Sequence, residues 1–257
     1  MAARSPWIGT SWKMNKTRAE ARQFAEAVKD SRIAESAAAR LFLVPPFTAI
    51  ESVATILAGE KIRIGAQNIH WADSGAWTGE ISLAMIKDVG ATLVEIGHSE
   101  RRRHFGETDE TVAKKVEAAV RHGLVALVCI GDTREEYEAG RTGEALARQT
   151  RAALSRIEKG RASQVVIAYE PVWSIGEGGT PANPAFADRQ HALIKNEALR
   201  LCGAALDVIY GGSVSLGNCR ALAAQPNIDG LFIGRAAWRA EGYIEIVRAV
   251  TEHLAEK

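Results

Sequence analysis

Several protein classes are excluded by what this sequence lacks. It has three cysteines, Cys129, Cys202 and Cys219, which are too few for a disulfide scaffold, and their odd number favours a reducing compartment. Basic residues number 32 and acidic residues 31, so no excess of positive charge points to a nucleic-acid partner. No apolar run approaches the ~18 residues of a membrane helix, and the first residues lack the apolar stretch of a signal peptide. We therefore expect a cytoplasmic protein without a nucleic-acid or membrane partner.

Two short motifs are also missing. Neither the His-x-x-x-His nor the Cys-x-x-Cys spacing of metal ligands occurs, so we predict no metal site. The phosphate-binding pattern Gly-x-Gly-x-x-Gly does not follow the first expected strand, which instead continues into Ser11–Asn15. An open sheet that binds a dinucleotide is therefore disfavoured.

The sequence does contain a regular alternation of strand-like and helix-like segments. Hydrophobic residues make up 47% and charged residues 25% of the 257 residues, which leaves ample material for a core. Short apolar runs predict eight strands, at Trp7–Ser11, Arg40–Val44, Ile62–Ala66, Thr92–Ile96, Val125–Ile130, Val165–Tyr169, Asp207–Tyr210 and Gly230–Ile233. Helical patterns fill the gaps, with roughly one helix for each strand. Eight such units in about 250 residues predict an α/β fold, a closed (β/α)8 barrel, as a single domain over residues 1–257.

Three local patterns predict where helices begin and which face they bury. Thr48–Glu51 has the pattern of a capping box, and Asn183 before Pro184 is typical of a helix start. The last helix is predicted from apolar residues at helical spacing, which are Tyr243, Ile246, Val247, Val250 and Leu254.

Three chemically reactive side chains follow three of the predicted strands. Lys13 follows the first strand, His98 the fourth and Glu170 the sixth. Each alone has an ordinary explanation: a surface charge, a structural imidazole, a capping carboxylate. In a parallel barrel, however, the strand ends meet at one face, where active sites lie. Together they suggest proton abstraction next to a carbonyl, with Glu170 as base, His98 polarising the carbonyl and Lys13 stabilising the oxyanion.

Glycine-rich loops follow the seventh and eighth strands. Gly211–Ser213 and Gly234–Arg235 offer backbone N–H groups at the place where barrels of this kind bind phosphate. A phosphorylated substrate is therefore expected.

The segment Pro171–Pro181, directly after Glu170, is long for a strand-to-helix connection. It combines apolar Val172, Trp173 and Ile175 with the flexible pair Gly178–Gly179. This composition suits a lid that closes and excludes water, although a rigid long loop is an alternative.

Four motifs in the right order resemble the triosephosphate isomerase family over nearly the whole chain. They are Trp12–Asn15, Gly97–Arg102, Ala168–Trp173 and Tyr210–Val214. The resemblance implies the TIM-barrel fold and an isomerase without cofactor. It implies Glu170 as the proton-shuttling base, His98 as a neutral imidazole and Lys13 as the electrostatic partner. It further implies Glu100 as a carboxylate beside the lysine, and a phosphate grip from backbone N–H groups of Gly176, Ser213, Gly234 and Arg235. By the same resemblance, Gln67–Glu80 is the loop that docks into a neighbouring subunit, so a homodimer is expected.

Three positions depart from the family pattern. Ser11 stands where the family usually has asparagine, and Gly234–Arg235 where it usually has two glycines. The lid ends in Glu177–Pro181 in place of the usual Thr-Gly-Lys. The resemblance implies that this position lies beside the reacting end of the substrate. The shorter Ser11 would then vacate space beside the substrate's terminal carbon, enough for one more hydroxymethyl group. Ser11, with Glu177 or Arg235 nearby, would hydrogen-bond the added hydroxyl, because burying it unpaired costs ~1–3 kcal/mol. Alternatively, the Arg235 side chain points to solvent.

Further stretches resemble the L-erythrulose-1-phosphate isomerase branch of this family. They are Gly9–Lys16, His70–Asp73 and Leu231–Trp238. That branch interconverts L-erythrulose 1-phosphate and D-erythrulose 4-phosphate during erythritol breakdown. Two alternatives stay open: the triose-phosphate reaction of glycolysis and gluconeogenesis, and a non-catalytic protein that binds phosphate esters.

Overall fold

Eight parallel strands form a closed barrel in the computed structural model, which describes residues 5–158, 160–176 and 178–256. The strands are β1 (Trp7–Ser11), β2 (Arg40–Val44), β3 (Ile62–Ala66), β4 (Leu93–Ile96), β5 (Val125–Ile130), β6 (Val165–Tyr169), β7 (Asp207–Tyr210) and β8 (Gly230–Ile233). Each strand pairs with the next, and β8 pairs with β1, which closes the barrel. The predicted (β/α)8 barrel is therefore confirmed. The one shifted boundary is at β4, which begins at Leu93, where the paired register starts, although the Thr92 backbone still bonds to Ile64 and Val125.

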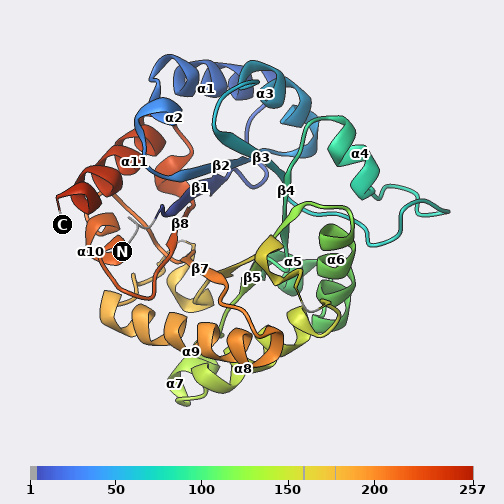
Figure 1. Ribbon diagram of the computed structural model, residues 1–257, viewed down its shortest axis with the longest axis vertical. Helices are drawn as coiled ribbons and strands as arrows, with labels where there is room; N and C mark the ends of the chain where they lie inside the picture. Colours follow the sequence, from blue (N-terminus) through green and yellow to red (C-terminus); the bar gives the residue numbers. More distant parts are fainter. Residues whose placement is uncertain (1–4, 159, 177, 257) are drawn as a thin grey trace.

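Helices surround the strands as an outer ring (Figure 1). They are α1 (Arg18–Asp30), α2 (Ile33–Ser36), α3 (Ile50–Ile56), α4 (Leu83–Asp88), α5 (Ser99–His104), α6 (Asp109–Arg121), α7 (Arg134–Glu138), α8 (Thr142–Leu154), α9 (Pro184–Cys202), α10 (Cys219–Ala223) and α11 (Ala240–Ala255). Four short 3-10 helices complete the described part of the chain: η1 (Phe47–Ala49), η2 (Ala162–Gln164), η3 (Val172–Ser174) and η4 (Arg235–Ala237). The prediction of about one helix per strand was therefore too low, because several connections also contain a short helix.

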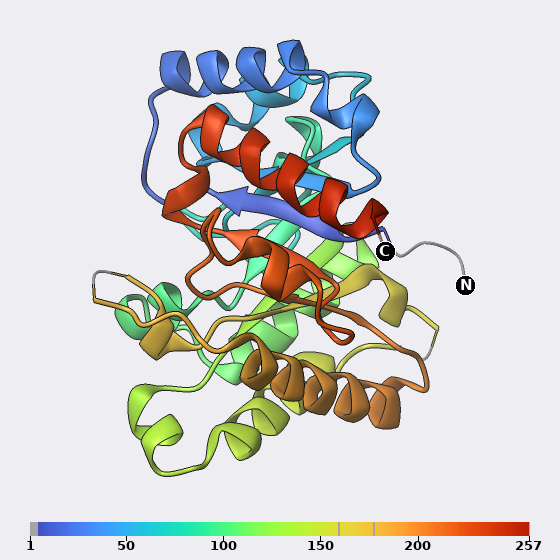
Figure 2. The same cartoon turned by 90° about the vertical axis from the view of Figure 1, so that its left-hand side faces the viewer.

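The three helix patterns have different outcomes. Asn183 caps α9, with its side chain accepting hydrogen bonds from the N–H groups of Ala185 and Phe186 and with Pro184 in the first turn. The apolar face of α11 is buried, and this last helix lies beside α1 (Figure 2). The capping box at Thr48 was wrong. A 3-10 helix that follows two prolines contains this residue. The helix α3 begins after it, without a side-chain cap.

The barrel interior is filled by its own small cluster of side chains. Phe42 and Phe232 lie with ring centroids 5.5 Å apart, and both rings are buried. Gly9 faces them, and a Cβ atom at this position would lie 2.3 Å from the Phe42 ring. A larger cluster fills the space between the strands and the helices. These two layers fix the strand ends in space, and with them the loops that follow.

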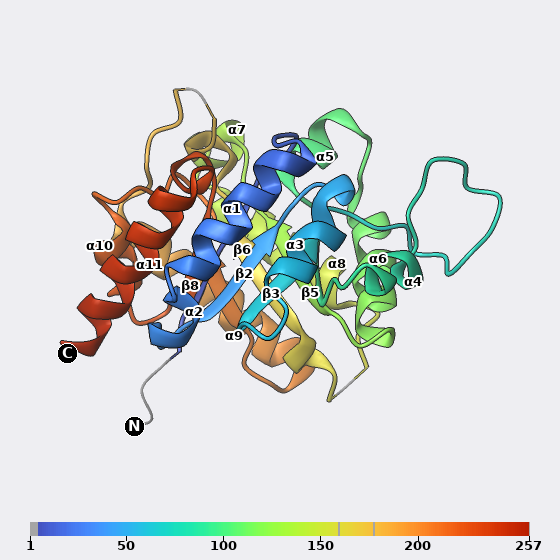
Figure 3. The ribbon, with the colours of Figure 1, turned by 90° about the horizontal axis from the view of Figure 1, so that it is seen from above.

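One loop stands apart from the barrel. The connection from β3 to α4 projects away from the rest of the molecule (Figure 3), and residues 73–80 are exposed. None of the helices in the described part of the chain combines the length and apolar character that a bilayer crossing requires.

Candidate active site

A cavity of about 400 Å³ opens at the carboxyl ends of the strands. Lys13, His98 and Glu170 all line it, although they follow three different strands, β1, β4 and β6. The glycine-rich segments after β7 and β8 line the same cavity, as do Ile175, Gly176 and Pro181 of the lid segment. The structure therefore brings together the three reactive side chains that the sequence analysis singled out.

Lys13 is held at the cavity by its backbone and by its side chain. Its φ of 52° lies in the left-handed region, which is uncommon for a residue other than glycine. Gln67 stabilises this conformation by donating from Nε2 to the Lys13 carbonyl oxygen at 2.9 Å. The ammonium Nζ lies 2.7 Å from Oε1 of Glu100, so Glu100 occupies the place expected of it. Partial burial works to raise the pKa of Glu100, but its hydrogen bond to Lys13 and the charge of Lys13 lower it overall.

His98 sits at the N-terminus of α5, and its ring takes part in capping that helix. Its Nδ1 accepts a hydrogen bond from the backbone N–H of Glu100 at 3.1 Å. A ring nitrogen that accepts carries no proton, so the ring proton lies on Nε2. Nε2 points to the cavity, 3.6 Å from Oε1 of Glu170. The imidazole is thus oriented as a hydrogen-bond donor toward a bound carbonyl.

Glu170 is buried directly after β6, next to the seventh strand end. Its backbone N–H donates to the carbonyl oxygen of Ile130 at 2.7 Å. A Cβ at Gly211 would lie 2.8 Å from its Cγ, so this carboxylate needs glycine on the neighbouring loop. Oε2 is buried and has no hydrogen-bond partner among the described residues. An unpaired buried acceptor is costly, and such atoms are typical of sites that await a ligand.

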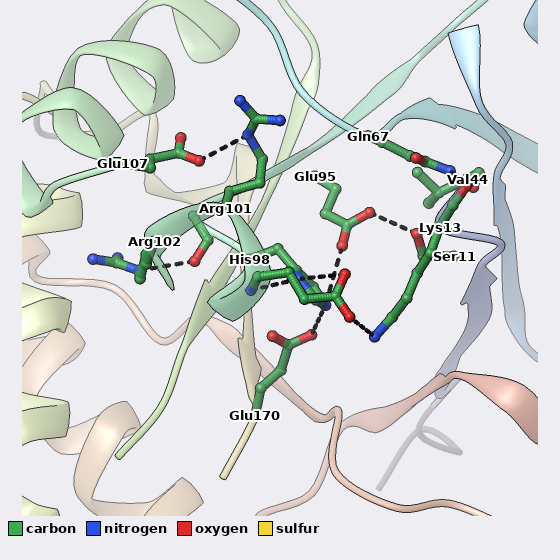
Figure 4. A network of polar contacts seen from close by, with 12 residues as sticks. Ser11, Lys13, Val44, Gln67, Glu95, His98, Arg101, Arg102, Glu107 and Glu170 are labelled. Carbon is green, nitrogen blue, oxygen red and sulfur yellow. Dashed lines mark hydrogen bonds and ion pairs between the residues drawn. The ribbon is translucent and has the colours of Figure 1, made fainter. Parts of the chain in front are cut away.

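A second buried carboxyl, which the sequence analysis did not assign, belongs to Glu95 and faces both the Ser11 hydroxyl and the His98 ring (Figure 4). Glu95 lies within β4 and accepts a hydrogen bond at Oε2 from the Ser11 hydroxyl at 2.8 Å. Its Oε1 is 4.0 Å from Nε2 of His98. Burial raises the pKa of Glu95 to about 7, and the negative charge of Glu170 adds to this rise. A charged residue inside an otherwise apolar strand was the available signal.

Three of these side chains also form a compact donor set. One ligand atom each from Glu95, His98 and Glu170 lies within 4.8 Å of the others. The sequence-based search for metal spacings could not detect them, because Glu170 comes from a distant strand. His98 and Glu170 line the cavity described above, whereas Glu95 lies next to them in the wall of an adjoining cavity.

The expected phosphate-binding residues line the cavity, but one N–H is already engaged. Gly176, Ser213, Gly234 and Arg235 are all part of its wall. The Ser213 N–H donates to Oγ of Ser174 at 3.2 Å, and the Ser213 hydroxyl donates to the Ser174 carbonyl oxygen at 2.6 Å. Arg235 is exposed at the start of η4 and forms no ion pair within the described ranges. Glu177, expected near this end, lies outside the described residues.

The lid segment is anchored in its first half. The Trp173 indole donates to Asp132 at 3.1 Å and stacks on Tyr137 with ring centroids 4.3 Å apart. Gly176 and Gly178 beyond it have left-handed backbones, with φ of 87° and 82°. The pivot of a closing motion would therefore lie after the anchored tryptophan.

This closed parallel barrel, with a base, an imidazole and an ammonium around one cavity, defines a barrel enzyme suited to proton transfer on a small substrate. The family model described as triosephosphate isomerase matches residues 6–250, and the chain belongs to the triosephosphate isomerase family.

Several relatives carry a more particular name. A Brucella abortus biovar 1 protein named L-erythrulose-1-phosphate isomerase is 55% identical over 242 residues, covering 94% of each chain. The protein of that name from Rhizobium rhizogenes is 53% identical over 242 residues, covering 94% of this chain and 93% of its own. The one from Mesorhizobium japonicum is 52% identical over 248 residues, covering 94% and 95%.

Proposed function

We propose that this protein isomerises a phosphorylated ketotetrose, converting L-erythrulose 1-phosphate to D-erythrulose 4-phosphate. The observation that carries the proposal is the convergence of Glu170, His98 and Lys13 on a single cavity lined by glycine-rich loops. The name shared by the relatives from Brucella, Rhizobium and Mesorhizobium supports the choice of substrate.

The proposed reaction moves one proton between neighbouring carbons. The Glu170 carboxylate removes the proton from C3, and the electron pair of that bond forms an enediolate across C2 and C3. The proton then returns to C2. The His98 Nε2–H donates to the carbonyl oxygen and relays the proton between O3 and O2, while the Lys13 ammonium stabilises the negative charge. Because the C2 ketone is reduced as the C3 alcohol is oxidised, the reaction balances within one molecule and requires no cofactor.

The phosphate end of the substrate would lie against the loops after β7 and β8. Backbone N–H groups of Gly176, Ser213, Gly234 and Arg235 are the proposed donors. The Ser213 N–H, now bound to Ser174, would have to exchange partners when the phosphate arrives. Closure of the lid segment then excludes water, which protects the enediolate from losing its phosphate.

Substrate preference tests the proposal directly. We expect a higher kcat/KM for L-erythrulose 1-phosphate than for dihydroxyacetone phosphate. Changing Ser11 to asparagine fills the space beside the terminal carbon, so Ser11→Asn should shift the ratio toward the triose. A clear preference of the unaltered protein for the triose would support the second candidate, triosephosphate isomerase. This candidate is favoured by the family and by the intact Lys13, His98 and Glu170.

Proton exchange separates catalysis from mere binding of phosphate esters. In deuterated water the substrate should incorporate deuterium at the reacting carbon. Glu170→Gln, which lacks the general base, is the control and should lose several orders of magnitude in exchange rate. Binding without exchange would indicate a non-catalytic phosphate-binding protein.

The remaining expectations are part of the same proposal. The chain would work in the cytoplasm as a homodimer through the Gln67–Glu80 loop, as one barrel domain over residues 1–257. Its place would be in erythritol breakdown if the tetrose is the substrate, and in glycolysis if the triose is.

A further inference from the structure

A second cavity of about 200 Å³ adjoins the first. Both are lined by Ser11, Lys13 and His98, so these three side chains form the boundary between them. Among the residues that the structure describes, no glycine-rich loop lines the second cavity, and its lining includes Glu95. A substrate whose phosphate lies against the loops of β7 and β8 therefore points its other end toward this second space.

Glu95 presents a polar group at that end. Its side chain is 3% exposed, and Ser11 donates to only one of its two carboxyl oxygens. The other oxygen, Oε1, lies 4.0 Å from Nε2 of His98, beyond hydrogen-bond distance. A carboxyl with this spare capacity, at a cavity wall, is placed to bind a hydroxyl group.

The electrostatic surroundings suit this use. Burial favours the neutral carboxyl, and so does the Glu170 carboxylate, whereas His98, the Ser11 hydroxyl and Lys13 favour the charged one. Near neutral pH the group is present in both forms, because its pKa is raised to about 7. The neutral form donates a hydrogen bond and the charged form accepts one, so either can pair with an alcohol.

We propose that Glu95 binds the terminal hydroxyl of the four-carbon substrate and thereby selects a tetrose phosphate over a triose phosphate. The proposal rests on the proposed function. Ser11 provides the space for the additional hydroxymethyl group and also orients the carboxyl that receives it. A triose phosphate has no group at this position, and with it bound, the spare Glu95 oxygen would stay unpaired.

A pair of substrates that differ only in that hydroxyl tests the proposal. One is L-erythrulose 1-phosphate and the other is its 4-deoxy analogue, which ends in a methyl group. We expect the unaltered protein to favour the hydroxylated substrate by about 100-fold in kcat/KM, because the analogue leaves a buried polar group unpaired. In Glu95→Leu, which removes the polar group at similar volume, this ratio should shrink to less than about 5-fold. Glu95→Asp withdraws the carboxyl by one methylene and should also lower the ratio.

A role confined to positioning Ser11 and His98 would give a different result. Both variants would then lose kcat/KM equally for the two substrates, with the ratio unchanged, and the proposal would be overturned. Competitive inhibition by inorganic phosphate, which engages only the glycine-rich loops, should be unaltered in a folded variant. Should Glu95→Leu not fold, the ratio in Glu95→Asp decides. Failure of the proposed function is separately visible, as a preference of the unaltered protein for dihydroxyacetone phosphate over L-erythrulose 1-phosphate.

Discussion

At the scale of single residues, the Glu95 carboxyl links the active-site cavity to the stability of the fold. Its pKa rises from the ordinary value of 4.5 to about 7 on folding, chiefly through burial. Between these two values the folded protein retains a proton that the unfolded chain releases. The free energy of unfolding therefore falls as pH rises through this window, and this loss is absent below it.

We expect Glu95→Gln to remove this loss, because an amide does not titrate. We compare the free energy of unfolding of the variant with that of the unaltered protein at the same pH. This difference should increase in favour of the variant by about 2 kcal/mol from about pH 5 to about pH 8. Urea unfolding at both pH values measures the change. A constant difference between the two proteins would show that Glu95 ionises normally in the fold. The substitution leaves in place His98, Glu170 and Lys13, whose charges act on this carboxyl from the segments after β4, β6 and β1.

The sequence predicted the site residues that directly follow the ends of strands. Lys13, His98 and Glu170 follow their strands, and all parallel strands of a barrel end at one face. Glu95 escaped this rule because it lies inside β4, where side chains were expected to be apolar. Its hydrogen-bond partner, Ser11, lies 84 positions away in sequence, and no local pattern contains that information.

At the scale of helices and strands, α9 illustrates how one side chain fixes the start of an element next to the lid. Asn183 accepts hydrogen bonds from the N–H groups of Ala185, at 2.9 Å, and Phe186, at 3.3 Å. These donors have no partner within the helix. We expect Asn183→Ala to lower the free energy of unfolding by about 1 kcal/mol.

Chemical denaturation measures this change, and Asn183→Asp provides the matched control. Aspartate keeps the accepting oxygen and adds a negative charge near the positive end of the helix dipole, so most of the stability should remain. Equal losses in the two variants would show that the cap contributes nothing and that the substitution harms the adjoining loop.

Elements differ in how well the sequence predicts them. Several strand bounds followed from continuous apolar runs, because strands covered on both faces are mostly apolar. The short helices α2, α5 and α7 were not predicted, since four to six residues are too few to display a helical period. At Thr48 a matching pattern was overridden by the turn that the preceding prolines start.

At the scale of the whole molecule, exposed apolar side chains gather around the second cavity. Met14, Phe47 and Phe105 line it, and Met14 is 96% exposed. The exposed part of the Gln67–Glu80 loop, residues 73–80, projects away from the barrel and carries a half-exposed Trp77 (Figure 3). We propose that this loop packs against the exposed apolar side chains around the second cavity of a partner chain, and a twofold-symmetric pair would use both surfaces twice.

This proposed pairing predicts the effect of a charge at its centre. Met14→Lys would bury two ammonium groups in a homodimer, so we expect the mass measured by light scattering to fall from two chains to one at micromolar concentration. Leu199→Lys, on α9 and 49% exposed before the change, is the matched control and should leave the mass unaltered. If the Met14 variant keeps the mass of the unaltered protein, the loop and the surface around the second cavity do not form the interface.

The partner's loop would also cover the outer rim of the second cavity, whose inner wall holds Glu95. Separation of the two chains should therefore lower kcat/KM for the tetrose phosphate. Competitive inhibition by inorganic phosphate should change less, because only the hydroxyl end of the site then becomes open to water.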